Sequence, residues 1–134
     1  MKETANQAGR YLIGALIALA IDACVMLVLV QWGTPTLLAR AFALLIGITT
    51  TYVFNRAFTF EVTHAATFGD WLRYVLAQSV GSVLNFVAST LAIGYLGRST
   101  WTVLVGVGVG AGIGFCYNFF AARRLLHRRG LPLD

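Results

Sequence analysis

The 134-residue sequence predicts an all-α polytopic membrane protein, a bundle of four transmembrane helices built from two repeated helical hairpins. Three observations predict this fold: an apolar composition, four apolar runs of spanning length, and an internal repeat. Hydrophobic residues make up 58% of the chain and charged residues 11%, against roughly 25% charged residues in a soluble domain. A soluble bundle of this size could not hide so much apolar surface, so lipid is the expected solvent for most of the chain.

The four apolar runs cover residues 11–30, 36–54, 71–96 and 100–122. Each is close to the roughly 20 residues that cross a hydrocarbon core, and runs of this kind satisfy their backbone groups as helices. Residues 55–70 are polar and are expected to form a linker between the hairpins, within a single domain. No removable signal peptide is expected, because the first run is too long and lacks a small-residue cleavage site.

Lysine and arginine are distributed unequally between the two sides of these runs. Eight lie on the side of the termini and the linker, and only Arg40 and Arg98 lie on the other side. Cytoplasmic loops carry the excess of basic residues, so both termini and the linker are expected to be cytoplasmic. The net charge of +5 fits a membrane surface, and no nucleic-acid partner is expected.

The second half of the chain repeats the first. Sliding the sequence along itself aligns the first helix of each half, and after a short insertion near the second outer link the second helix of each half also aligns. Polar and basic residues then fall at equal depths. The aligned pairs are Arg10 with Arg73, Tyr11 with Tyr74, Asp22 with Asn85, Gly47 with Gly114, and Arg56 with Arg123.

Small and polar residues form stripes at helical spacing on three of the expected helices. Small residues at this spacing let helix backbones approach closely in lipid, so we expect these faces to pack within one chain or between two chains of a homodimer. The stripes are Gly47, Thr51 and Asn55; Gln78, Ser82, Asn85 and Ser89; and Gly106, Gly110, Gly114 and Asn118.

Asp22 lies about halfway along the first expected span, where a carboxylate is costly unless it is paired, hydrated or protonated. Arg40, in the outer half of the next span, is the candidate partner. The pair either fixes helix pairing or belongs to a polar functional site within the membrane. The candidate intramembrane site consists of Asp22, Arg40, Gln78, Ser82 and Asn85.

Arginines also gather at the cytoplasmic ends of the spans. A guanidinium group matches phosphate oxygens, and basic pockets between helices on this side bind lipid headgroups. The alternative is that these residues only anchor the topology. The candidates are Arg10, Arg56, Arg73, Arg123 and Arg124, with Arg56 and Arg123 as the leading pair because the repeat aligns them.

Three segments resemble the GtrA-like family over about residues 9–126. Asn55-Arg56-Ala57-Phe58-Thr59-Phe60 looks like the motif that closes the second helix of these proteins. The segment 10–14 followed by Asp22 is similar to their first helix, and Asn118 with the segment 119–124 is similar to their last motif. The chain departs from the family pattern at Ala57, where a second basic residue is common, and at residues 125–126, where two leucines replace an aromatic ending.

The resemblance implies a flippase for a polyprenyl-phosphate-linked sugar in the bacterial inner membrane, serving cell-surface polysaccharide synthesis. A separate membrane glycosyltransferase would use the lipid, and Asn55 and Asn118 would join the arginines in binding it. His64 and His127 stand alone, so we expect no metal, no cofactor and no enzymatic activity. Two alternatives remain: an accessory subunit of such a glycosyltransferase and, less favoured, a small multidrug-type exporter.

Overall fold

The computed structural model describes residues 2–97 and 99–127, and within these ranges it consists of helices and connecting loops without strands. Its elements are α1 (Lys2–Gln31), α2 (Thr36–Phe54), the π-helical turn η1 (Asn55–Thr59), α3 (Phe68–Leu96) and α4 (Thr100–His127). Four helices are long and apolar enough to cross a membrane. The predicted all-α, four-span fold is confirmed.

Three helices, α1, α3 and α4, extend beyond the predicted spans into the polar flanks. α1 begins at Lys2 instead of residue 11, with Glu3 in its first turn, where a negative charge complements the helix dipole. Gln7 Nε2 donates to Glu3 Oε1 at 3.3 Å, one turn away. α4 continues to His127 instead of ending at residue 122, and its last turns carry arginines, which favour a helix C-terminus.

Local capping sets the ends of α3. The helix starts at Phe68 because Thr67 Oγ1 accepts the backbone N–H of Asp70 at 3.1 Å, and the Thr67 hydroxyl donates to the Asp70 carboxylate at 2.8 Å. This is a capping arrangement of the Ser/Thr-x-x-acid kind. Gly97 follows the last turn with φ 101°, a conformation that glycine adopts without strain.

The sequence predicts that residues 55–70 form a linker. In the structure the first five of these residues, Asn55–Thr59, instead form a π-helical turn directly after α2. Phe60 N–H donates to the Asn55 carbonyl at 2.9 Å, a five-residue step. The wider turn places Asn55 and Thr59 in the interior, 0% and 2% exposed. π-helical turns occur frequently at functional sites.

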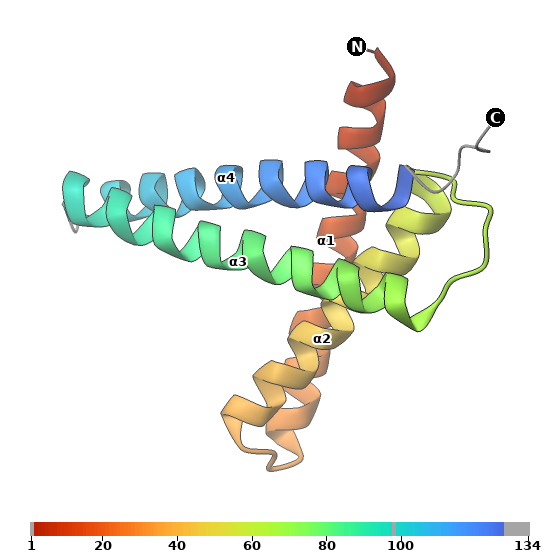
Figure 1. Cartoon of the computed structure of the whole chain (residues 1–134). Coiled ribbons are helices and arrows are strands. Elements are labelled where there is room, and N and C mark those ends of the chain that lie inside the picture. Colours follow the sequence, from red (N-terminus) through yellow and green to blue (C-terminus); the bar gives the residue numbers. More distant parts are fainter. Residues whose placement is uncertain (1, 98, 128–134) are drawn as a thin grey trace.

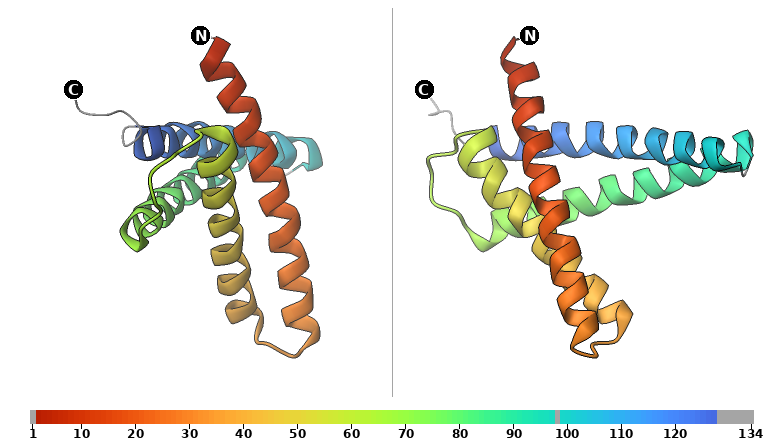
Figure 2. Two further views of the ribbon diagram at one scale, coloured as in Figure 1. Left: turned by 90° about the vertical axis from the view of Figure 1, so that its right-hand side faces the viewer. Right: turned by 180° about the vertical axis from the view of Figure 1, so that it is seen from behind.

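The four helices form two antiparallel hairpins, α1–α2 and α3–α4, which cross near their open ends (Figures 1 and 2). The two closed ends point in different directions, and the first turns of α1 extend past α4 (Figure 1). The crossing is held by a mainly aromatic core. Its buried members are Tyr11, Tyr52, Phe60, Tyr74, Phe119, Ala122 and Leu126.

Outside this core, most large apolar side chains face outward. Leu37 is 82% exposed and Phe86 is 70% exposed, and many others along all four helices are exposed by more than a third. A water-soluble protein would not leave such continuous apolar faces uncovered. This distribution suits a surface in contact with lipid tails.

The contacts inside the hairpins follow the predicted repeat. Gly47 of α2 faces Asp22 of α1, whereas Gly114 of α4 faces Asn85 of α3. The repeat aligns Asp22 with Asn85 and Gly47 with Gly114, so equivalent residues make equivalent contacts in the two hairpins. The glycine stripe of α4 therefore packs against α3 within one chain.

Candidate functional site

A cavity of about 330 Å³ lies between the hairpins, and residues of all four helices line it with a mostly apolar wall that carries several polar groups. We call it the intramembrane cavity. Four of the five residues predicted for the intramembrane site line it: Asp22, Arg40, Gln78 and Ser82. Its other lining residues include Tyr11, Thr51, Phe115 and Asn118.

Asp22 and Arg40 form the ion pair that the sequence predicts. Arg40 Nη1 donates to Asp22 Oδ2 at 2.7 Å. The Asp22 side chain is 12% exposed and the Arg40 side chain is 55% exposed, so the acid is held inside and the guanidinium reaches it from the rim. Gly47 of α2 lies beside Asp22, at a distance that leaves room for a small side chain.

A second polar group on the cavity wall centres on Gln78 of α3. Tyr11 Oη donates to Gln78 Oε1 at 3.1 Å, and Gln78 Nε2 donates to the Asn118 backbone carbonyl at 3.4 Å. Ser82 Oγ donates to the Gln78 carbonyl at 3.2 Å, one turn along the helix. These contacts join α1, α3 and α4 at one point.

Two buried acceptors on this cavity lack a partner. Asp22 Oδ1 and Asn118 Oδ1 are buried and accept no hydrogen bond from a described residue. A buried acceptor without a donor is costly, and most such atoms in proteins have partners. Both atoms are fully enclosed, and Asn118 Oδ1 points at Gly81 of α3, so a ligand or water in the cavity pairs with them only after a local shift of the wall.

Asn85, the fifth residue predicted for the intramembrane site, does not line the cavity. It is half-buried in the α3–α4 interface, where its backbone carbonyl and side chain face Gly110 and its Cβ faces Gly114. It lies two turns beyond Gln78, away from the crossing of the hairpins. Its alignment with Asp22 reflects equivalent packing inside each hairpin and not a shared site.

Asn55, predicted to bind the lipid, is enclosed by protein. Its Nδ2 donates to Tyr74 Oη at 2.8 Å, and its Oδ1 accepts from Thr59 Oγ1 at 2.8 Å. Tyr74, which is 0% exposed, also interacts with Tyr11. The two tyrosines thus stand at the centre of the crossing. In the sequence, the signal of this central role is their equivalent position in the repeat.

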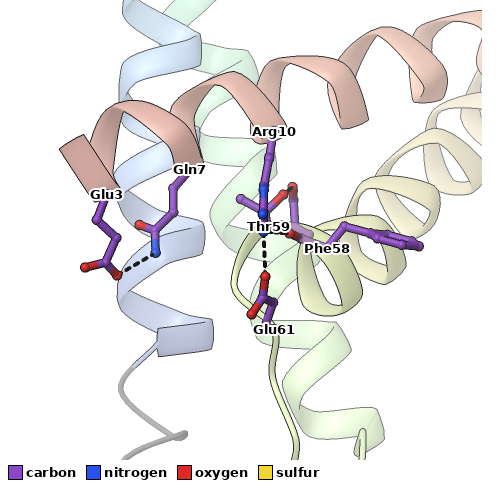
Figure 3. A network of polar contacts seen from close by, with 7 residues as sticks. Glu3, Gln7, Arg10, Phe58, Thr59 and Glu61 are labelled. Carbon is purple, nitrogen blue, oxygen red and sulfur yellow. Dashed lines mark hydrogen bonds and ion pairs between the residues drawn. The ribbon is translucent and has the colours of Figure 1, made fainter.

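The candidate arginines do not form one cluster. Arg10 Nη1 donates to the Phe58 carbonyl at 2.8 Å and to Glu61 Oε1 at 2.6 Å (Figure 3). Arg56 donates to His64 Nε2 of the linker at 3.3 Å, and Arg73 lines a small pocket with His64. The cavities at Arg10 and Arg73 share no lining residue.

The arginines of α4 lie near the end of that helix. Arg123 is half-buried and Arg124 is exposed. Neither forms an ion pair with another described residue. The structure therefore leaves Arg123 available to a ligand but gives it no specific connection with Arg56.

A comparison with protein-family models identifies the GtrA/DPMS transmembrane domain, which matches residues 10–127. No curated protein and no solved structure matches the chain. The family match covers all four helices and the turn between α2 and α3. The chain therefore belongs to the GtrA/DPMS transmembrane-domain family, and its membership supports a role in a membrane process that involves polyprenyl-phosphate-linked sugars.

Proposed function

We propose that the protein is a flippase that moves a polyprenyl-phosphate-linked sugar across the bacterial inner membrane, with both of its termini in the cytoplasm. Family membership supports the class of lipid, and the multi-pass fold supports passage through a membrane. The observation that carries the proposal is the intramembrane cavity itself, where Asp22 of α1, Arg40 of α2 and Gln78 of α3 come together.

The chemistry of this cavity suits a sugar. Each sugar hydroxyl brings a donor, and transferring an unsatisfied hydroxyl from water into hydrocarbon costs about 4–8 kcal/mol. The Asp22–Arg40 pair, Gln78 and Ser82 on the cavity wall offer polar groups in place of water. At about 330 Å³ the cavity lies at the lower end of the usual range for ligand sites, so we expect it to hold one sugar unit.

In this proposal the protein makes and breaks no covalent bond. The lipid tail stays in the bilayer while the head passes along the cavity, and a separate membrane glycosyltransferase uses the sugar on the far side for cell-surface polysaccharide synthesis. Self-association as a dimer is part of the proposal. Since the α4 glycine stripe packs inside one chain, a dimer would use other surfaces.

The test is transport of a fluorescent undecaprenyl-phosphate sugar by purified protein in sealed vesicles. Asn118→Ala removes a polar side chain from the cavity wall, and we expect transport to fall about tenfold, the kinetic equivalent of roughly 1.4 kcal/mol. Two serines of α3 provide a matched pair, because each donates to the carbonyl four residues earlier. Ser82→Ala, on the cavity, should slow transport, whereas Ser79→Ala, on the exposed face, should not.

Unchanged transport by Asn118→Ala, with unfolding temperature and insertion intact, would rule out a sugar route through this cavity. If the wild type transports nothing but binds the glycosyltransferase and stimulates it, the chain is an accessory subunit. Transport of cationic dyes in place of the sugar lipid would indicate an exporter.

A further inference from the structure

A second cavity, of about 440 Å³, surrounds Arg10 at the end of the hairpin crossing. Arg10 lines it with Phe54, Ala57, Phe58 and Glu61. The Arg10 side chain is 42% exposed, and its Nη1 is held in place by the Phe58 carbonyl. The cavity thus has one oriented cation at its wall, and Figure 3 shows this arginine extending from α1 towards the turn after α2.

An apolar groove of about 500 Å³ continues from this cavity. It runs along α2 from Phe54 to Leu45, about 14 Å along the helix or roughly half of a hydrocarbon core, and Trp71 of α3 lines it beside Thr49. The groove and the Arg10 cavity share Phe54 and Phe58 as lining residues. A cation and a long apolar groove therefore meet at one wall. A single-chain lipid with a terminal anion has the same arrangement of charge and tail.

Glu61 occupies the anion position of this site. Its carboxylate is 2.6 Å from Arg10 Nη1, although its side chain is 69% exposed on the linker. Its backbone has φ 51°, a left-handed conformation that disfavours residues other than glycine. The Glu61 carboxylate is exposed and its backbone is strained, so a phosphate is well placed to displace it from Arg10. A phosphate accepts charge-assisted hydrogen bonds from a guanidinium in the same way.

The repeat supplies an internal comparison. Arg73 corresponds to Arg10, and its pocket is only about 20 Å³ because His64 of the linker, Asp70 at the start of α3, and Leu125 and Leu126 of α4 fill the space. Arg73 itself is exposed and Arg10 is half-buried, so the two equivalent arginines differ in the cavity beside them and not in access to solvent. Of this pair, Arg10 is the one that has both a cavity and an adjoining apolar groove beside it.

We propose that the Arg10 cavity binds the terminal phosphate of a polyprenyl phosphate, that the groove along α2 holds its chain, and that Glu61 is a built-in anion displaced on binding. This inference rests on the proposed function, whose substrate is such a lipid. It moves the phosphate contact from the leading sequence candidates, Arg56 and Arg123, to Arg10.

The test is binding of undecaprenyl monophosphate to the purified full chain in phosphatidylcholine nanodiscs. Arg10→Lys keeps the charge but loses the planar fork, and we expect about tenfold weaker binding. Arg73→Lys, the repeat equivalent, should change affinity less than twofold. Glu61→Gln removes the competing anion at constant shape and should tighten binding severalfold. Val53→Trp, which fills the groove at an exposed position, should weaken binding.

Equal losses in the two lysine variants, or weaker binding by Glu61→Gln, would overturn the site. Binding of inorganic phosphate or undecaprenol as tightly as the phosphate lipid would show that phosphate and chain are not both recognised. Binding of a diacyl phosphatidic acid with equal affinity would overturn the assignment to a single chain. If the wild type transports the sugar lipid while none of these variants alters binding, the site is wrong and the proposed function stands. If the wild type binds no polyprenyl phosphate, both fail.

Discussion

The two hairpins share one sequence design but differ in how closely their helices pack. In α3–α4 a Cβ added at Gly110 would lie 2.5 Å from the Asn85 carbonyl oxygen, a distance that real Cβ atoms essentially never reach. In α1–α2 a Cβ at Gly47 would find its nearest neighbour, Asp22 Cβ, at 3.4 Å, an ordinary contact. The second hairpin is therefore the more tightly packed scaffold. The first has room for an ion pair beside the intramembrane cavity.

The same contrast applies to the repeated arginines. Arg10 lines a cavity of about 440 Å³, whereas the pocket beside the exposed Arg73 is only about 20 Å³. An internal repeat creates two equivalent positions, and a single irregular linker then makes them unequal. The Arg10 cavity belongs to the first hairpin and the turn after it, whereas the intramembrane cavity lies between the two hairpins.

The largest effect is expected from the packing difference. Gly110→Ala should destabilise the protein by about 1–3 kcal/mol, because a methyl group must push two helix backbones apart. Gly112→Ala, on the open face of the same helix, and Gly47→Ala should change stability little. Unfolding in mixed micelles measures all three. A Gly110→Ala protein as stable as the Gly112→Ala protein would remove the contrast between the hairpins.

A smaller effect is expected from the ion pair in the first hairpin. A double-mutant cycle with Asp22→Asn and Arg40→Gln should give a coupling of about 1 kcal/mol, since the acid is nearly enclosed but the guanidinium is half-exposed. The same unfolding assay provides the four free energies. If the losses of unfolding free energy in the two single variants add up to the loss in the double variant, the contact between the two side chains contributes nothing to stability.

Much of this architecture could be predicted because it depends on periodicity. The spans, the glycine faces and the Asp22–Arg40 pair follow from residues that recur at helical spacing within one hairpin. The crossing of the hairpins depends instead on single contacts such as Tyr74 with Asn55, which no period reveals. The partners of Arg10 and Arg56 depend on the linker, because Glu61 and His64 lie in non-repeating sequence. Asn85 lies away from the intramembrane cavity because equal depth in a hairpin does not fix the distance from the crossing.

The smallest effect separates the two central tyrosines. Tyr74→Phe leaves Asn55 Nδ2 without its acceptor at a position that is 0% exposed, whereas Tyr11→Phe releases Gln78 Oε1 beside a cavity that water can enter. Hydrogen bonds between membrane helices contribute about 0.6 kcal/mol on average, and an enclosed donor costs more when it is abandoned than an accessible acceptor. We therefore expect Tyr74→Phe to destabilise the protein by about 1 kcal/mol more than Tyr11→Phe, measured by thermal unfolding of both variants. If Tyr11→Phe is the more damaging, the centre of the crossing is the Gln78 contact. The first hairpin then holds α3 mainly through Tyr11 of α1 instead of through Asn55 at the buried end of α2.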